Sequence, residues 1–274
     1  MNKVWFITGA SGGIGQAIVD TALRHGDFVA AATRSGILKT QQNSKNLLVL
    51  KLDISEQNQN IFDNAVKSVA DKFGRIDFLV NNAGHGRITN FEETSEQSIK
   101  ALYEVNVFGT MRMTRAVLPI MRKQRQGHIF NISSGAGYCG GPTAYHTSKF
   151  AVTGFSCSLA FELAPFGIKV TNVAPGMFRT SFYDANKIKT DYDIHIPDYD
   201  GCRWQTEFMQ ENSKHNQIGN PAKLGELLYE VAYSENPPLH LPVGADAVAV
   251  LEDLQAKLYN DVSAWKDKAS KTDY

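Results

Sequence analysis

A tyrosine and a lysine stand four residues apart in the segment Tyr145-His146-Thr147-Ser148-Lys149. In a helix this spacing puts both side chains on one face, about one turn apart, so the ammonium lies beside the phenol. A free tyrosine titrates near pH ~10, and a neighbouring cation favours the phenolate. The pair is therefore a candidate acid/base, although the same spacing alone also fits an exposed helix face without chemistry.

A glycine-rich segment near the N-terminus reads Thr8-Gly9-Ala10-Ser11-Gly12-Gly13-Ile14-Gly15. It follows a short apolar run and opens a helical pattern, so Gly9, Gly13 and Gly15 fall in a turn between strand and helix. Without a Cβ, these residues let the backbone approach a pyrophosphate at the positive end of a helix dipole. This context predicts a dinucleotide-binding loop rather than merely a tight turn.

The end of the second predicted strand indicates which dinucleotide is bound. Folds that prefer NAD usually carry an acidic residue there for the ribose 2′-hydroxyl. Here Thr33 stands at that position and Arg34 follows. A 2′-phosphate would meet a guanidinium rather than a carboxylate, so the sequence favours NADP(H) over NAD(H). Alternatively, Arg34 is a solvated loop cation and the selectivity is weak.

Composition narrows the classes of partner. Lys plus Arg and Asp plus Glu each number 28, so the formal charge is zero, which argues against nucleic acid and anionic membrane surfaces. No apolar run is long enough for a membrane-spanning helix. Cys139, Cys157 and Cys202 lack metal or disulfide spacing, so we expect no metal site and a reducing, cytoplasmic setting.

The elements that must position these residues follow a βα alternation up to about residue 176. Strands are predicted at Val4–Thr8, Phe28–Thr33, Leu47–Leu52, Phe78–Asn81, His128–Ser133, Lys169–Val173 and Leu239–Pro242. Helices are predicted at Gly15–His25, Gln57–Phe73, Glu96–Arg122, Tyr145–Ala164, Pro221–Glu235 and Ala247–Lys268. The strands are apolar on both faces, as in a covered parallel sheet. The order predicts one α/β domain over residues 1–274, a doubly wound Rossmann fold with a mostly parallel seven-stranded sheet and helices on both faces.

Two regions depart from this regular pattern. Pro119 falls inside the third predicted helix, where a proline kinks or ends the helix. Residues 181–216 mix aromatic and polar residues with few aliphatic ones, and are predicted to be a substrate-loop insertion, partly helical at Trp204–Ser213. Tyr138, Phe182 and Trp204 are candidates either to touch a hydrophobic ligand or to pack the loop onto the body.

Several separate motifs together resemble the short-chain dehydrogenase/reductase family, in its single-domain branch, over nearly the whole length. In chain order they are Thr8–Gly15, Asp53-Ile54, Asn81-Asn82-Ala83-Gly84, Asn106, Ser133-Ser134, Tyr145–Lys149, and Pro175-Gly176 followed by Thr180. The resemblance implies an oxidoreductase that transfers a hydride between a nicotinamide and a carbonyl or secondary alcohol substrate.

The resemblance also implies a catalytic set of Asn106, Ser134, Tyr145 and Lys149. Tyr145 would exchange the proton with the carbonyl oxygen, and Ser134 would hydrogen-bond that oxygen. Lys149 would lower the pKa of the tyrosine and bind the ribose. Asn106 would bind a water next to Lys149, although an Asn in a helix also makes local backbone hydrogen bonds.

A cofactor-binding set follows from the same resemblance. Asp53 would accept a hydrogen bond from the adenine, beside Ile54, or would simply form a turn at the strand end. The segment after Pro175-Gly176 would close over the nicotinamide, with Thr180 at its carboxamide. The expected cofactor contacts are Gly9, Ser11, Gly13, Ile14, Gly15, Arg34, Asp53, Ile54, Asn82, Ala83, Gly84, Tyr145, Lys149, Pro175, Gly176 and Thr180.

The serine is where the chain departs from the family pattern. The family places it thirteen residues before the tyrosine, whereas Ser134 precedes Tyr145 by eleven residues and Ser133 by twelve. Strand alternation lets only one of the two face the site. The local pattern Asn131-Ile132-Ser133-Ser134 favours Ser134, with a short deletion in Tyr138–Pro142, and Ser133 remains the alternative.

Two functions from different classes fit these patterns, and a related chemistry on the same scaffold, such as dehydration or epimerisation, is a third alternative. The first is an NADP-dependent carbonyl reductase or alcohol dehydrogenase acting on a small molecule. The second is a non-catalytic NADP-binding redox sensor on the same fold, a class that typically loses the tyrosine or the lysine. The resemblance also implies a homodimer or homotetramer formed through the helices near residues 96–122 and 145–164. The substrate itself cannot be read from the sequence.

Overall fold

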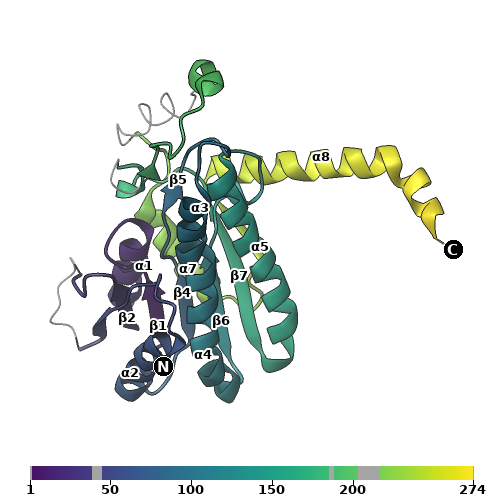
Figure 1. Cartoon of the computed structure of the whole chain (residues 1–274). Coiled ribbons are helices and arrows are strands. Elements are labelled where there is room, and N and C mark those ends of the chain that lie inside the picture. Colours follow the sequence, from purple (N-terminus) through teal and green to yellow (C-terminus); the bar gives the residue numbers. More distant parts are fainter. Residues whose placement is uncertain (1, 39–44, 185–187, 203–215, 274) are drawn as a thin grey trace.

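One parallel sheet of seven strands organises the chain (Figure 1). The strands lie in the order β3-β2-β1-β4-β6-β7-β9, and every neighbouring pair is parallel. They are β1 (Val4–Thr8), β2 (Phe28–Thr33), β3 (Leu47–Lys51), β4 (Phe78–Asn81), β6 (Gly127–Ile132), β7 (Ile168–Pro175) and β9 (His240–Val243). The predicted doubly wound sheet is confirmed. Because the strand order reverses between β1 and β4, a crevice opens at their carboxyl ends.

The structure, a computed structural model, describes residues 2–38, 45–184, 188–202 and 216–273. The helix predicted at Trp204–Ser213 lies outside these residues. Within the described part, no helix combines the length and the apolar character needed to span a bilayer.

Helices cover both faces of the sheet, and β1 shows why. Its side chains alternate, so Trp5 and Ile7 pack toward α1 (Gly13–Arg24) and α7 (Pro221–Tyr233). Val4 and Phe6 pack on the other face, against α2 (Gln59–Phe73), α4 (Thr110–Gln124) and α5 (Thr143–Leu163). All four side chains are at most 1% exposed. Burying each one stabilises the fold by roughly 1.5–3 kcal/mol, which holds the strand ends, and the loops that follow them, in place.

The long helix predicted at Glu96–Arg122 is divided into three parts. An α-helix, α3 (Glu96–Tyr103), leads into a π-helical segment at Glu104–Gly109 and then into α4. The wider turns carry Asn106 into the interior, and a Cβ on Gly109 would lie only 2.5 Å from the Ile54 carbonyl oxygen. Pro119 does not end the helix, because α4 continues to Gln124.

The segment after β7 returns across the open end of the crevice. It forms a short 3-10 turn at Ser181–Tyr183 and then β8 (Ile188–Lys189), which pairs with β5 (Gly86–Arg87) in a second, two-stranded sheet. Farther on, Asn220 caps α7 by accepting a hydrogen bond from the Ala222 backbone N–H, with Pro221 at its first position, as the sequence predicts.

The last helix, α8 (Ala245–Ala269), runs away from the sheet (Figure 1). Near its start Ala247 is buried, whereas Leu258 and Trp265 farther along are 54% and 63% exposed. The base of α8, rather than its far end, therefore borders the crevice.

Candidate active site

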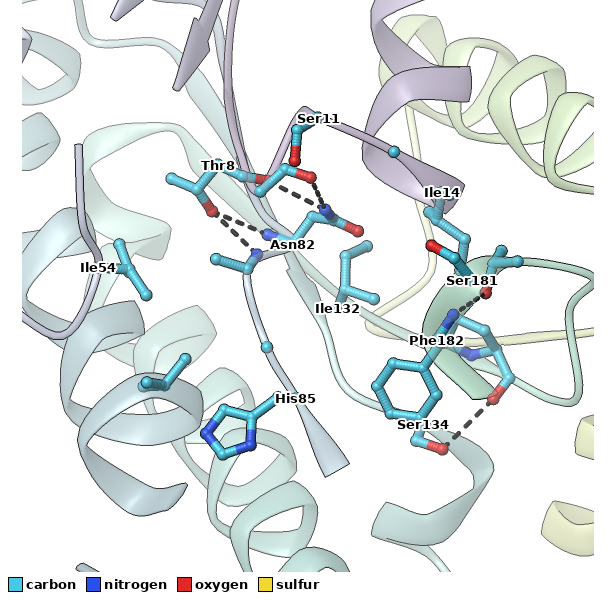
Figure 2. A pocket seen from close by; sticks show the side chains of 18 of the residues that line it. Thr8, Ser11, Ile14, Ile54, Asn82, His85, Ile132, Ser134, Ser181 and Phe182 are labelled. Carbon is cyan, nitrogen blue, oxygen red and sulfur yellow. Dashed lines mark hydrogen bonds between the residues drawn. The ribbon is translucent and has the colours of Figure 1, made fainter. Parts of the chain in front are cut away.

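A cleft of about 500 Å³ lies at the carboxyl ends of the strands, where the sheet order reverses (Figure 2). It collects loops from β1, β2, β3, β4, β6 and β7. The predicted site residues that line it are Gly9, Ser11, Gly13, Ile14, Arg34, Asp53, Ile54, Asn82, Ala83, Gly84, Ser134, Tyr145, Lys149, Pro175, Gly176 and Thr180. Two predicted residues, Gly15 and Asn106, do not line it and lie behind its wall.

The glycine loop has the geometry that a pyrophosphate site needs. Gly9 and Gly13 have φ angles of +64° and +58°, in the left-handed region that glycine tolerates best. A Cβ on Gly15 would lie 2.4 Å from the Gly9 carbonyl oxygen, so no larger residue fits there. The loop therefore presents bare backbone at the start of α1, and these residues fit a dinucleotide.

Asn82 joins this loop to the end of β4. Its side-chain Nδ2 donates to the carbonyl oxygens of Thr8 and Gly9, both at 3.0 Å. The Thr8 hydroxyl accepts from the backbone N–H groups of Asn82 and Ala83, at 3.1 and 3.2 Å (Figure 2). The Asn82 side chain is thus used to shape the loop.

Asp53 and Arg34 lie together at one end of the cleft. Asp53 Oδ1 accepts from the Ser55 backbone N–H at 2.9 Å and from its hydroxyl at 2.7 Å. Partial burial acts to raise the pKa of Asp53, but the Ser55 hydrogen bonds and the nearby Arg34 charge together hold it below its usual value. Asp53 therefore forms a turn at the strand end and also presents a carboxylate to the cleft.

Tyr145 projects from the first turn of α5 and lines the cleft near Ser134. Burial raises the pKa of its phenol to about 12, although the Ser134 hydrogen bond acts in the opposite direction. The sequence predicts a lowered pKa instead, because it shows the neighbouring cation but not the desolvation. In the structure the phenol is protonated at neutral pH.

Lys149 lies one turn farther along α5, as predicted. Its Nζ is 5.8 Å from the centre of the Tyr145 ring and donates to the Ile132 carbonyl oxygen at 3.0 Å. Burial lowers the pKa of this ammonium to about 8, because a charge is costly away from water. The helix thus delivers both side chains to one wall of the cleft.

The two serines after β6 point in different directions. The Ser133 hydroxyl donates to the Lys149 carbonyl oxygen at 3.0 Å and lies 3.1 Å from the Thr153 hydroxyl, so it binds α5. The Ser134 hydroxyl accepts from the Ala136 N–H at 3.1 Å and lies beside Tyr145. The geometry therefore favours Ser134 as the serine that meets a substrate oxygen.

Asn106 is buried and its side chain is already engaged. Its Oδ1 accepts from the His85 backbone N–H, and its Nδ2 donates to the His85 carbonyl oxygen, both at 3.0 Å. The same Nδ2 lies 3.1 Å from the Ser148 hydroxyl. The π-helical segment thus braces the chain after β4 against α5.

Asp246, at the base of α8, is a residue that the sequence analysis missed. Its Oδ2 accepts from the Met177 backbone N–H at 2.6 Å. A Cβ on Gly176 would lie 2.0 Å from Oδ1, so the carboxylate fits against the turn only because residue 176 is glycine. Asp246, at the start of α8, therefore fixes the Pro175–Gly176 turn. The sequence signal for a tight turn just before Asp246 is Gly244.

The segment that Asp246 fixes meets the glycine loop. A Cβ on Gly13 would lie 3.2 Å from Thr180 Cβ, so the two segments almost touch. The Thr180 hydroxyl accepts from the Phe182 N–H at 3.2 Å and turns the chain back over the cleft. Other lining residues without a sequence signal of their own are His85, Ser181 and Tyr183.

Comparisons with known proteins agree with this geometry. The sequence profile of the short chain dehydrogenase family matches residues 3–190. The chain belongs to this family. One relative of this short-chain dehydrogenase is the 3-ketodihydrosphingosine reductase of Bacteroides thetaiotaomicron, 35% identical over 244 residues that cover 88% of each chain.

Two solved structures are also similar. A short-chain dehydrogenase from Streptomyces avermitilis superposes with a TM-score of 0.86 and 34% identity, covering 100% of both chains. ElxO, solved with NADP bound, has a TM-score of 0.70 and 25% identity, covering 88% of this chain and 96% of its own. The fold and the cleft are thus those of an oxidoreductase family whose members include proteins that bind nicotinamide cofactors.

The Asp246 contact generates a prediction. Replacing Asp246 with Ala leaves the Met177 N–H without its acceptor, so we expect the free energy of unfolding to fall by about 1–3 kcal/mol. NADPH affinity should fall with it, because the Pro175–Gly176 turn loses its support. Urea unfolding and calorimetric titration measure the two effects. Asp253→Ala, an exposed change on the same helix, is the control, and an Asp246→Ala protein that behaves like it would contradict the role.

Proposed function

We propose that this short-chain dehydrogenase is an NADP(H)-dependent oxidoreductase that interconverts a carbonyl compound and a secondary alcohol. The observation that carries the proposal is the Tyr145 phenol, near Ser134 and one helical turn from Lys149, in the cleft that the glycine loop borders. A dinucleotide held on that loop brings hydride chemistry to the cleft. The relative that reduces a ketone, 35% identical, supports the same reaction class.

In this proposal Tyr145 is the acid. Its phenol is protonated at neutral pH, since burial raises its pKa to about 12, so the proton is available for a carbonyl oxygen that gains negative charge. Ser134 donates a hydrogen bond from its hydroxyl to the same oxygen, keeps its own proton, and holds the oxygen where the charge develops. In the oxidation direction, the Tyr145 oxygen must first be ionised, and the resulting phenolate accepts the hydroxyl proton of the alcohol.

Lys149 and Asn106 are assigned supporting roles. Protonated Lys149 stabilises negative charge on the Tyr145 oxygen and binds the cofactor ribose. A pKa near 8 lets it also pass a proton at physiological pH. Asn106 holds the His85 backbone, which places the adjoining Gly84 close to Lys149. The second lone pair of Asn106 Oδ1 is assigned to the water expected next to Lys149.

The cofactor is proposed to lie along the lined cleft from the β2 end to Tyr145. The glycine loop holds the pyrophosphate, and the turn at Pro175–Gly176 with Thr180 holds the nicotinamide. Asp53 and Ile54 hold the adenine. Arg34 is exposed at the end of β2 and lines the cleft, so it is placed to pair with a 2′-phosphate, which is the reason for preferring NADP(H).

The proposed partners are a small carbonyl or alcohol substrate and further copies of this chain. Phe108, Phe150 and Phe161 are 46%, 45% and 86% exposed on the helical layer formed by α4, α5 and the π-helical segment between α3 and α4. Such a surface supports a homodimer or homotetramer, and the mass in solution, measured by sedimentation, decides between these states and a monomer.

The second candidate, a non-catalytic NADP-binding sensor, predicts tight NADPH binding with no turnover of any ketone or aldehyde. The retained Tyr145 and Lys149 weigh against it. Absorbance at 340 nm, followed over a panel of carbonyl compounds, separates the two functions.

Replacing Tyr145 with Phe removes only the hydroxyl. We expect turnover to fall by at least about 100-fold, because the proton donor is lost, while the dissociation constant of NADPH changes by less than about threefold. Steady-state assays measure turnover, and fluorescence titration measures the dissociation constant of NADPH. Tyr259→Phe, on the exposed part of α8, is the matched control. Turnover that survives in the Tyr145 variant would reject the assigned role.

Replacing Arg34 with Ala tests the cofactor preference. We expect NADPH to bind about tenfold more weakly, because a charge-assisted contact to the 2′-phosphate is lost, and NADH to bind unchanged. Titration of both cofactors gives the ratio, with Arg122→Ala on α4 as the control. A ratio equal to that of the unaltered protein would show that Arg34 does not read the 2′-phosphate.

A further inference from the structure

An aromatic ring stands directly in front of the candidate acid. The ring centres of Phe182 and Tyr145 are 6.1 Å apart with the planes tilted by 47°, a common arrangement for interacting aromatic side chains. Phe182 and Ser134 both line the cleft (Figure 2). A carbonyl oxygen seated between Tyr145 and Ser134 therefore brings its substituents against this ring.

The ring belongs to a small apolar cluster. Ile88, Tyr183 and Ile188 are buried at its centre, and Met177 and Phe182 pack against it. The Tyr183 ring meets Phe182 edge-on, with the ring centres 5.5 Å apart. Phe182 and Tyr183 form an apolar wall of the cleft, called the Phe182 wall below, and this wall is part of a packed cluster rather than a lone exposed side chain.

Gly86 allows this wall to lie so close to the end of β4. A Cβ on residue 86 would lie 3.2 Å from Phe182 Cζ and 3.1 Å from Ile188 Cγ1, closer than ordinary van der Waals contact. The pairing of β5 with β8 brings these groups together. Space for the ring is therefore built into the backbone.

Polar contacts hold the outer side of the same segment. The Arg87 guanidinium lies 2.8 Å from the Asp193 carboxylate and donates to the Asp191 carbonyl oxygen at 2.9 Å. The Arg87 side chain is only 7% exposed. An ion pair whose arginine is largely buried thus fixes the segment that carries this apolar cluster, so the cluster can select among substrates by shape.

Charge is distributed unevenly along the cleft. Arg34 and Asp53 line the end near β2 and β3, and Lys149 lies behind Tyr145. Among the described residues, the lining beside Phe182 and Tyr183 adds no Asp, Glu, Lys or Arg. A charged group attached to the reacting carbonyl on the Phe182 side would be desolvated among described lining residues that offer it no ion-pair partner, which is unfavourable.

We propose that the substrate is a ketone whose neighbouring substituents are uncharged and apolar, preferably aromatic, and that Phe182 is the residue that selects it. This inference rests on the proposed function, because it assumes that the carbonyl oxygen binds between Tyr145 and Ser134. An aryl group beside the carbonyl packs on the Phe182 ring, and the Tyr183 edge closes the same side.

The test uses matched ketones with the unaltered full-length protein and NADPH. Benzoylformamide and benzoylformate have the same shape and differ in charge, and acetophenone and 2-butanone differ in the aryl group. We expect kcat/KM at least about tenfold higher for the amide than for the carboxylate, and for acetophenone than for 2-butanone.

Phe182→Ala supplies the residue-specific measurement. We expect kcat/KM for acetophenone to fall by about tenfold, mainly through KM, and that for 2-butanone by less than about threefold. NADPH affinity should stay within about twofold, and Phe91→Ala, at a 59% exposed position outside the lining, should change neither ketone. Binding of acetophenone to the NADP⁺-loaded protein, measured by NMR without turnover, should weaken in Phe182→Ala alone.

The outcomes separate the two proposals. If ketones are reduced but benzoylformate equals or exceeds the amide, or if Phe182→Ala leaves the acetophenone to 2-butanone ratio unchanged, the substrate inference is overturned and the proposed function stands. If no ketone is reduced, the proposed function is overturned. Acetophenone binding that weakens in Phe182→Ala would then still support an aromatic ligand beside Phe182. Binding that is the same in Phe182→Ala would overturn the aromatic-ligand inference as well.

Discussion

The site depends on the close approach of two backbone segments at the point where the strand order reverses. The loop after β1 and the end of β4 pack so tightly that a Cβ on Gly9 would lie 2.8 Å from Ala83 Cα. Asn82 and Thr8 then hydrogen-bond the two segments together. This contact shapes the glycine loop, sets where α1 begins, and places the chain after β4 against Asn106. A larger residue at Gly9 or Gly15 would separate the segments and disturb everything that lines the cleft.

A second constraint is the burial of groups that would otherwise be solvated. Lys149 is buried, and Tyr145 is half-buried with its ring against Phe182. Burial raises the pKa of the phenol and lowers that of the ammonium, so both groups are moved toward their neutral forms. The arrangement favours a Tyr145 phenol that donates a proton, and a Lys149 whose protonation changes when charge is brought beside it. The same burial makes the wall selective, because any group placed there must tolerate a low-dielectric setting.

Local signals predicted much of this structure. Strands β1, β2 and β4 begin and end at the predicted residues, because a short apolar run bounded by glycine or polar residues is a specific signal for a buried strand. The glycine loop and the Tyr145–Lys149 pair were also predicted from local spacing alone. Strand alternation also predicted that Ser133 and Ser134 point in different directions. The break in the helix at Glu104–Gly109 and the Asp246 contact, in contrast, depend on residues distant in the chain. The pKa of Tyr145 was mispredicted because spacing shows a neighbouring charge but not the burial around it.

In the proposed reaction, a hydride reaches the carbonyl carbon in this cleft while Tyr145 supplies the proton. The most direct measurement uses NADPH carrying deuterium at one face of nicotinamide C4, with an aryl ketone as substrate, and locates the label by mass spectrometry and NMR. We expect deuterium on the carbinol carbon when one face of C4 is labelled, and none when the other face is labelled. An alcohol free of label from both faces, or no alcohol at all despite bound NADPH, would contradict it.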